Sequence, residues 1–403
     1  MNAKKLIEGY NLNNISVGVL GGHSALDVAH GAKKWGFKTV CVAQKGREDT
    51  YAKYFKTRPY TLRPGRGASG VGRGEVGCID EVIEVHRFQD ISKKAIVDQL
   101  RAMNCVFVHN RYFWVYFDEY KKVEEDFTVP IFGSRYLLRL EERDQEFNQY
   151  HLLEQADIRI PKVFKKPEDI DRLVIVKAPE EARGYERAFF LATRESYIDE
   201  AKERLEAREI TEKGLSGARI EEYVIGAPVN FNFFYSPLNH SLRSGSGQAL
   251  SGLELLGTDM RRQTNLDGFL RMTAEEQRQA LKYTSPKMIE TGHVAVTVKE
   301  SLLEKAFEMG EKFVKATQKL PKAIDPSGKG IIGPFALQGA VVTEDGKEDI
   351  VIFDVSFRIP GSPGIRATPY SGYLYGESMS VGERIAMELR GAIEQERLEE
   401  LIT

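Results

Sequence analysis

The sequence predicts a two-part α/β protein, in which a parallel sheet comes first and an α+β unit follows. Three short apolar runs rich in β-branched residues alternate with helical patterns, and strands that alternate with helices predict a parallel sheet with right-handed crossovers. The runs cover residues 15–21, 38–43 and 104–109. From Val129 the pattern changes to a strand pair and further strands. We therefore expect domains at 1–128 and 129–403.

Helical patterns at 25–35 and 91–103 separate the strands of the first part. Between the second strand and the run "CIDEVIEV" lies the segment 57–77, which is dense in Gly and Arg. Such a composition cannot bury a core and predicts a mobile surface loop. The functional alternative is a flexible arm that closes over an anionic ligand.

The second part reads as a short strand and a long helix within 129–162, followed by a series of strands. The strands are expected at 172–179, 187–197, 218–226, 228–236, 252–261, 330–342 and 349–359. A Ser/Gly-rich insertion covers 239–251, and helices are expected at 301–318 and 381–398. No internal repeat is evident.

The composition is that of a globular protein without a macromolecular partner. Of the 403 residues, 42% are hydrophobic and 29% are charged, with a formal net charge of −2. This balance argues against a nucleic-acid partner, and the sequence has no apolar run of membrane-spanning length and no signal-peptide core at its N-terminus. Three scattered cysteines fit reduced thiols. We expect a cytoplasmic enzyme.

The first strand runs into Gly21-Gly22 and then His23 and Ser24. Backbone N–H groups and the positive end of a helix dipole favour an anion at such a strand end. The glycine pair lacks the full spacing of a dinucleotide site or a P-loop, so it is a weak signal alone.

Polar residues at strand ends of the second part point to a nucleotide. Lys177 ends a β-branched strand, where its ammonium can meet phosphate oxygens. Glu221, Glu222, Tyr223 and Val224 close another strand, where an acidic residue can hold a ribose hydroxyl and an adenine amine. The alternatives are a surface charge for Lys177 and solvated carboxylates for the glutamates.

Gln338 and Asp354 occupy like positions on two late strands that are expected to pair. A carboxamide and a carboxylate on core-like strands need polar partners. From adjacent strands they could converge on one Mg²⁺, which prefers oxygen ligands.

These residues carry a resemblance to the ATP-grasp superfamily. More closely, the chain resembles the archaeal ligases that formylate aminoimidazole carboxamide ribotide (AICAR) with formate and ATP, the 5-formaminoimidazole-4-carboxamide ribonucleotide synthetases. The stretches that match include "GGHSALDVAHGAKKWGFKTVCVAQKGRE", "VIVK", "IEEYVIG", "LLGTDMRRQTNLDG" and "GIIGPFALQ", in order along nearly the whole chain. The resemblance implies a Rossmann-like pre-ATP-grasp domain followed by an ATP-grasp domain that binds ATP and metal.

The activity that the resemblance implies belongs to purine (IMP) biosynthesis. ATP phosphorylates formate to formyl phosphate, and the ribotide amine attacks it to give the formylated ribotide FAICAR, ADP and phosphate. The cofactors would be ATP and Mg²⁺, and the partners the small-molecule substrates. We also expect a homo-oligomer.

The same resemblance implies roles for individual residues. His23 and Ser24 would bind the sugar-phosphate of the ribotide, with added charge from Lys45 and Arg47. The segment "GTDMRRQTNLDG" would line the cleft near the reacting carboxylate and supply catalytic groups, with Asn265 also contacting the ribotide. Its implied site residues are Asp259, Arg261, Asn265 and Asp267.

Two departures from the related ligases keep other functions open. Residues 178–190, "APEEARGYERAFF", contain one glycine where the related ligases have a glycine-rich segment over the ATP phosphates. Asp354 stands where they have a glutamate. The alternatives are a paralogue that joins another carboxylate or amine, and a non-catalytic nucleotide-binding subunit.

Overall fold

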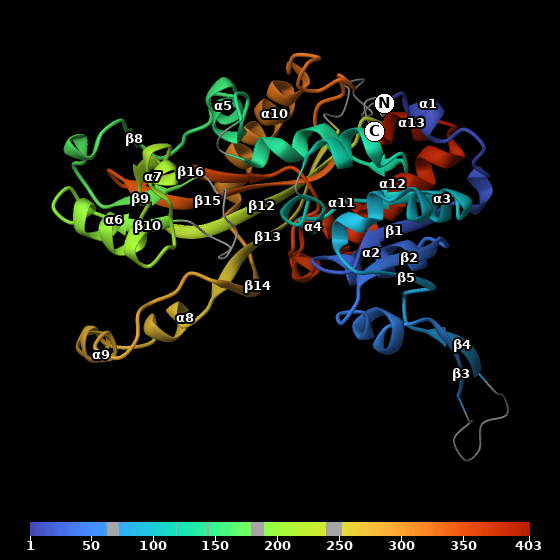
Figure 1. Cartoon of the computed structure of the whole chain (residues 1–403), viewed down its shortest axis with the longest axis horizontal. Helices are drawn as coiled ribbons and strands as arrows, with labels where there is room; N and C mark the ends of the chain where they lie inside the picture. The colour runs from blue at the N-terminus through green and yellow to red at the C-terminus, as the bar shows by residue number, and fades with distance from the viewer. Residues whose placement is uncertain (63–71, 118, 143–144, 179–188, 239–251) are drawn as a thin grey trace.

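The computed structural model describes residues 1–403 apart from 63–71, 118, 143–144, 179–188 and 239–251. The two chain termini lie beside each other (Figure 1). The C-terminal Thr403 and Ile131 exchange two backbone hydrogen bonds, of 2.9 and 3.1 Å. Among the described helices, none is long and apolar enough to cross a membrane.

The first sheet is parallel and five-stranded, in the order β5-β2-β1-β6-β7. Its strands are β1 (Ser16–Leu20), β2 (Lys38–Gln44), β5 (Glu81–Val85), β6 (Cys105–Val108) and β7 (Ile131–Phe132). Every residue of β1 and β6 is buried, as expected for central strands of a sheet that is covered on both faces. The predicted parallel sheet, with crossovers through α2 (Ala25–Lys34) and α3 (Lys94–Ala102), is confirmed.

Two segments beyond residue 128 pack with this first sheet. β7 is its edge strand, and helix α12 (Val381–Glu394) lies against α2. The two helices approach closely at Gly31 and Gly382, because a Cβ on Gly31 would lie 2.3 Å from the backbone of Gly382. The division at residues 128 and 129 stays a prediction, but the packing around the first sheet uses residues on both sides of it.

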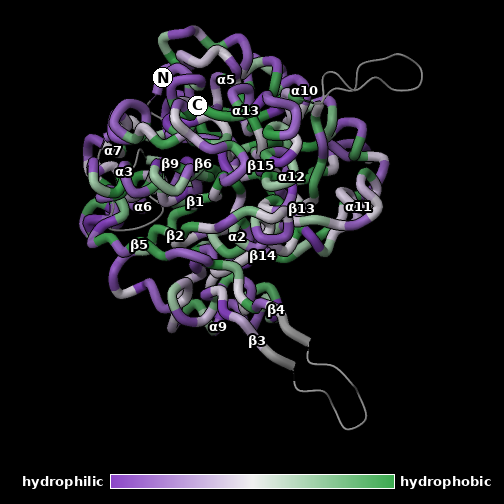
Figure 2. Tube along the Cα trace, turned by 90° about the vertical axis from the view of Figure 1, so that its right-hand side faces the viewer, coloured by the Kyte–Doolittle hydropathy of each residue, from purple (hydrophilic) through white to green (hydrophobic). Residues whose placement is uncertain are grey.

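Two antiparallel sheets make up most of the second part, in the orders β10-β9-β11-β8 and β14-β13-β12-β15-β16. The smaller sheet contains β8 (Val163–Phe164), β9 (Val174–Lys177), β10 (Phe189–Ala192) and β11 (Arg219–Glu222). The larger contains β12 (Ala227–Tyr235), β13 (Leu253–Gln263), β14 (Glu290–Val296), β15 (Gly333–Glu344) and β16 (Lys347–Ser356). Helix α10 (Leu303–Gln318) packs on the larger sheet, where the rings of Phe313 and Phe335 stack with centroids 5.6 Å apart. Figure 2 shows hydrophobic segments concentrated in the middle of the molecule and hydrophilic ones on its periphery.

Two predictions for the connecting segments are wrong. The expected long helix within 129–162 is a 3₁₀ segment, Arg135–Glu141, and a separate short helix, α5 (Gln149–Gln155). Asn148 starts this new helix as its N-cap, since its side chain accepts hydrogen bonds from two backbone N–H groups of the first turn. The ends of the Gly/Arg-rich segment are not loop but pair as β3 (Arg58–Leu62) and β4 (Gly72–Val76), a hairpin that projects from the body (Figure 1).

An arm between β13 and β14 also projects from the body and was not predicted (Figure 1). It carries α8 (Leu266–Phe269) and α9 (Ala274–Ala280). The remaining described α-helices are α1 (Ala3–Leu6), α4 (Tyr112–Val115), α6 (Tyr197–Glu206), α7 (Glu212–Ser216), α11 (Tyr370–Tyr375) and α13 (Leu398–Leu401).

Arg135 ties the chain terminus to the segment that joins the two parts. Its side chain is fully buried, and burial lowers the pKa of its guanidinium to about 10. The guanidinium donates to the carbonyls of Val123 (3.0 Å), Phe127 (2.7 Å) and Val129 (2.9 Å), and also to that of Thr403. One side chain thus satisfies four buried carbonyls.

We predict that Arg135→Met lowers the thermal midpoint of unfolding by several degrees. The apolar side chain removes the guanidinium donors. The Thr403 carbonyl keeps the Ile131 N–H, but each of the other buried carbonyls left unsatisfied costs about 1–3 kcal/mol. Circular dichroism melts at a fixed scan rate measure the effect. The control is Arg278→Met on the exposed face of α9, which should melt with the parent protein; equal midpoints for both variants would contradict the assignment.

Candidate functional site

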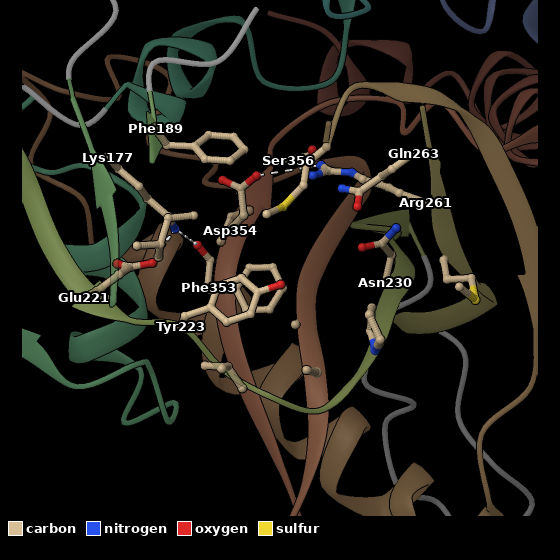
Figure 3. A pocket seen from close by; sticks show the side chains of 18 of the residues that line it. Lys177, Phe189, Glu221, Tyr223, Asn230, Arg261, Gln263, Phe353, Asp354 and Ser356 are labelled. Atoms are coloured by element: carbon tan, nitrogen blue, oxygen red, sulfur yellow. Dashed lines mark hydrogen bonds and ion pairs between the residues drawn. The ribbon is translucent and has the colours of Figure 1, made fainter. Parts of the chain in front are cut away.

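A cavity of about 410 Å³ lies between the two antiparallel sheets. Strands β9, β10 and β11 supply one wall, and β12, β13, β15 and β16 supply the other. Figure 3 shows Lys177 and Glu221 on one side, Arg261 on the other and Asp354 between them. The residues predicted to bind nucleotide all line this cavity: Lys177, Glu221, Glu222, Tyr223 and Val224.

Lys177 is buried at the end of β9, with 7% of the residue exposed. Its ammonium forms an ion pair with Glu221 and donates to the Tyr150 hydroxyl at 3.2 Å. Glu221 is also buried and accepts from Nε of Arg219 at 2.8 Å. The ammonium is therefore held at the cavity wall by a compensating carboxylate, with a second cation close by.

A β-bulge positions the third partner of Lys177. Gln338 pairs with Asp354, but the next residue of β15, Gly339, pairs with Ile352. Phe353 is the extra residue, and its carbonyl accepts from Lys177 Nζ at 3.2 Å. Through this bulge, the strand pair that carries the candidate metal ligands Gln338 and Asp354 contacts Lys177 (Figure 3).

Glu221 and Glu222, which are predicted to bind the nucleotide, have different surroundings. Glu221 is buried against Lys177, whereas Glu222 lies at the rim and accepts from Nη1 of Arg172 at 3.0 Å. The chain then passes through Tyr223 and Val224 to Ile225, which is 80% exposed. Along this edge of the cavity, two carboxylates are thus followed by aromatic and aliphatic side chains.

Arg261 lies where the expected metal ligands meet. Its Nη2 donates to Oε1 of Gln338 and lies 3.8 Å from Oδ2 of Asp354. On its other side, Nε lies 3.2 Å from Oε2 of Glu290. Gln338 and Asp354 are register partners, as the sequence analysis expects of pairing strands, and in this structure a guanidinium contacts both.

A chain of ionisable groups runs from Asp259 to Glu290. Asp259 is buried and accepts from the side-chain amides of Asn230 (2.9 Å) and Asn232 (2.6 Å). His293 contacts Asp259 through Nδ1 and lies 2.9 Å from Oε1 of Glu290 through Nε2. Burial alone would lower the pKa of His293, but its two carboxylate partners outweigh burial and raise the pKa to about 9. His293 is thus held as a cation at neutral pH.

Glu290 and His293 share one face because of a second bulge. In a regular strand, residues three apart point to opposite faces. Here Arg262 pairs with Gly292 and Gln263 pairs with Glu290, so Thr291 is the extra residue. The bulge therefore turns both side chains toward the same site.

The turn after β1 brings His23 to this site. The Asn110 side chain donates to the carbonyls of Leu20 (3.0 Å) and His23 (2.9 Å), which fixes the turn. Gly361 packs directly on the imidazole, since a Cβ there would lie 1.4 Å from Cε1 of His23. Ser24 has φ +67° and donates its hydroxyl to the Pro360 carbonyl at 2.8 Å. Segments more than 300 residues apart in sequence thus meet at His23.

A smaller cavity of about 30 Å³ adjoins the first. Its walls combine His23, Asp259, Glu290 and His293 with groups that also line the large cavity. The residues common to both cavities are Arg111, Asn230, Arg261, Ser356 and Arg358. Arg358 is buried and lies 3.3 Å from the Glu141 carboxylate. Arginines therefore surround the junction.

Five predicted site residues do not line either cavity, and one of them is Ser24. Asn265 is engaged in a turn of the arm, where its side chain donates to the Ser285 carbonyl (2.9 Å) and accepts from the Lys287 N–H (2.6 Å). Asp267 pairs with Arg262 at 3.3 Å. The other two are Lys45 and Arg47. The glycine-poor segment that includes 179–188 lies outside the described residues.

Glu290, His293 and Arg358 line the cavities but are not predicted from the sequence. Glu290 and His293 lie in "ETGHVAV", where a lone histidine resembles any strand histidine and the bulge leaves no alternation to detect. Arg358 follows Asp354 by four residues in "DVSFR", which is its only sequence signal.

Two family models match the chain. One, described as "Protein of unknown function (DUF1246)", covers residues 17–164, and the other, "Domain of unknown function (DUF1297)", covers 196–403. Among solved structures, the chain is similar to an IMP biosynthesis protein PurP from Thermococcus kodakaraensis, at 26% identity and a TM-score of 0.65 over 96% of this chain and all of that one.

More distant structures agree on the fold. N5-carboxyaminoimidazole synthetase from Staphylococcus aureus complexed with ADP matches with a TM-score of 0.54 and 14% identity, over 93% of this chain and 77% of that chain. The predicted architecture of a Rossmann-like unit followed by an ATP-grasp unit is confirmed.

Curated relatives match at full length. The 5-formaminoimidazole-4-carboxamide-1-(β)-D-ribofuranosyl 5′-monophosphate synthetase of Methanothermobacter thermautotrophicus is 37% identical over 99% of this chain and 97% of its own length. The enzyme of that name from Methanosphaera stadtmanae is 36% identical with the same coverage. The chain therefore belongs to the 5-formaminoimidazole-4-carboxamide ribonucleotide synthetase family, a family of ATP-grasp ligases.

Proposed function

We propose that this protein is an ATP-dependent ligase that formylates AICAR with formate, giving FAICAR, ADP and phosphate. The observation that carries the proposal is the meeting of two cavities at Arg261. One cavity has the size and lining for a nucleotide, and the other is a small polar site beside it. A ligase that activates a carboxylate with ATP needs this adjacency, because the acyl phosphate must form where the amine can attack it.

The large cavity is proposed to bind ATP. Lys177 supplies the charge for phosphate oxygens, and the Glu221–Val224 edge supplies carboxylate and backbone groups for the ribose and adenine. Phe189 and Ile225 add apolar surface for the base. The Lys177–Glu221 ion pair keeps the ammonium in place while the cavity is free of ligand.

Gln338 and Asp354 are proposed to hold Mg²⁺. A carboxamide oxygen and a carboxylate on adjacent strands match the preference of Mg²⁺ for oxygen ligands. Arg261 contacts both groups in this structure, so its guanidinium would turn away from them when Mg²⁺ binds. Bound Mg²⁺ would neutralise the phosphates of ATP, and Asp354 is one methylene shorter than the glutamate of the related ligases.

Arg261 is proposed to hold formate and then formyl phosphate by a two-pronged contact. Arg111 and Arg358 add positive charge at the junction of the cavities, where an anionic ribotide would enter. His23 belongs to the ribotide site in this arrangement, from the turn that Asn110 fixes. The chain's own task is positioning the three substrates and stabilising the developing charge.

Phosphate release measures the function directly. With ATP, Mg²⁺, formate and AICAR, the full-length protein should release phosphate and form FAICAR, whereas omission of any one, or addition of EDTA, should reduce release to background. Release without AICAR but with another amine would favour the paralogue with a different substrate. No release under any combination would overturn the proposal.

Lys177→Ala should weaken ATP binding about tenfold, which corresponds to about 1.4 kcal/mol for a lost charge-assisted contact. Isothermal titration calorimetry with ATP measures the change. The matched control is Lys162→Ala, whose side chain pairs with Asp171 at the exposed edge of the same sheet and should leave ATP affinity within twofold. Unchanged affinity in the Lys177 variant would remove this residue from the nucleotide site.

A further inference from the structure

His23 and Glu290 form a pair whose geometry differs from that of an anion-binding site. Nε2 of His23 lies 3.6 Å from Oε1 of Glu290, and both side chains are largely buried. A phosphate dianion placed against this imidazole would also face the Glu290 carboxylate. The sugar-phosphate contact expected of His23 is therefore electrostatically unfavourable, and the nearby Arg111 and Arg358 suit the phosphate better.

The two nitrogens of His23 have different surroundings. The Glu290 carboxylate favours a proton on Nε2, whereas Nδ1 is buried and has no hydrogen-bond partner among the described residues. With the proton on Nε2, Nδ1 keeps a free lone pair. Burial lowers the pKa of His23, against the opposing effect of Glu290, so the ring is neutral at pH 7. A neutral imidazole with one oriented nitrogen and one free nitrogen has the form of a general base.

The other histidine of the cluster cannot serve as the base. Both nitrogens of His293 are occupied, one by Asp259 and the other by Glu290. The role of His293 is to hold Glu290 from one side, while Nε of Arg261 holds it from the other at 3.2 Å.

His23, Glu290 and His293 also offer three ligand atoms within 4.8 Å of one another, which raises the question of a metal. Two observations argue against one. Glu290 already pairs with the guanidinium of Arg261, and His293 is held as a cation between its two carboxylates. A metal cation placed here would be repelled by the Arg261 guanidinium and by the His293 cation.

We propose, on the basis of the proposed function, that His23 accepts the proton of the attacking ribotide amine and that Glu290 orients its ring. The amine nitrogen forms a bond to the formyl carbon, and the bond from that carbon to the phosphate oxygen breaks. The nitrogen loses one proton to Nδ1 of His23, which passes it to the departing phosphate. His23 is then neutral again, and the products are FAICAR and hydrogen phosphate.

Charged groups from several elements face this pair and set its pH response. They are Asp259 and Arg261 of β13, Glu290 and His293 of β14, Arg111 after β6 and Arg358 after β16. Among them, Glu290 raises the pKa of His23, and Arg358 and Arg111 lower it. Because the neutral ring is the active form, turnover should fall as pH drops through the His23 pKa.

The test uses the full-length protein and follows both halves of the reaction. Product formation with ATP, Mg²⁺, formate and AICAR reports the amine attack. Exchange of ¹⁸O from the β,γ-bridge of ATP to non-bridging positions, with formate present, reports reversible phosphoryl transfer. His23→Ala should lower kcat for product at least about 100-fold, the lower range for general-base catalysis, and leave the exchange rate within threefold. The acid limb of the kcat–pH profile should also disappear.

Glu290→Gln supplies the second variant. The amide keeps the shape but removes the charge that raises the His23 pKa, so the acid limb of the kcat–pH profile should move to lower pH. The matched control is Glu275→Gln on exposed α9, which should keep the parent profile. Circular dichroism and ATP affinity confirm that each variant folds.

Three results would overturn the assignment. They are a His23→Ala variant within threefold of the parent kcat, an equal loss of product formation and isotope exchange, and an unmoved acid limb in Glu290→Gln. The parent protein separates this test from that of the function itself, because a parent without formate- and AICAR-dependent turnover contradicts the ligase proposal, whatever the variants do.

Discussion

The site depends on the contacts that the guanidinium of Arg261 makes. This guanidinium lies at the junction of the two cavities and contacts Glu290, Gln338 and Asp354 from three strands of one sheet. In water such contacts are worth little, but here the partners are half-buried or buried, so the attraction is screened less. The Arg261 cation thus fixes the positions of side chains from both cavities, the one proposed for ATP and the one beside the proposed ribotide site.

Two β-bulges determine which groups can meet at this cation. The bulge at Phe353 gives Lys177 a carbonyl partner, and the bulge at Thr291 turns Glu290 and His293 to one face. Without the extra residue on β14, one of these two side chains would point away from the cavity. The larger sheet therefore supplies most of the chemistry through local departures from regular pairing.

The long-range arrangement rests on contacts that join the ends of the chain. His23 packs on Gly361, Ser24 donates to the Pro360 carbonyl, and helices α2 and α12 approach through Gly31 and Gly382. These contacts place the turn after β1 against the segment that follows β16, the strand that carries Asp354. The first sheet is thus fixed to the ATP-grasp sheets by the chain's C-terminal segment, and its position determines whether His23 reaches the smaller cavity.

Much of the fold follows from sequence pattern, because buried strands and helices have a regular period. Apolar runs predict β1, β2, β6 and the late pair β15–β16. Lys177 and Asp354 are predictable as site residues because each is a polar residue at the end of, or within, an apolar strand. The arm and the Glu290–His293 pair are not predictable, since a bulge removes the alternation that marks a strand face. Asn265 illustrates the converse: a motif residue that the resemblance implies for the site uses its amide to close a turn.

The central claim is that the protein activates a carboxylate by phosphorylation beside a bound amine, and one measurement tests it most directly. The protein is incubated with ATP, Mg²⁺, AICAR and formate labelled with ¹⁸O in both oxygens, and the released phosphate is analysed by mass spectrometry. The account predicts one ¹⁸O atom in each phosphate, because the carboxylate oxygen that attacks ATP leaves with the phosphoryl group. Phosphate free of ¹⁸O, released together with formylated ribotide, would contradict it.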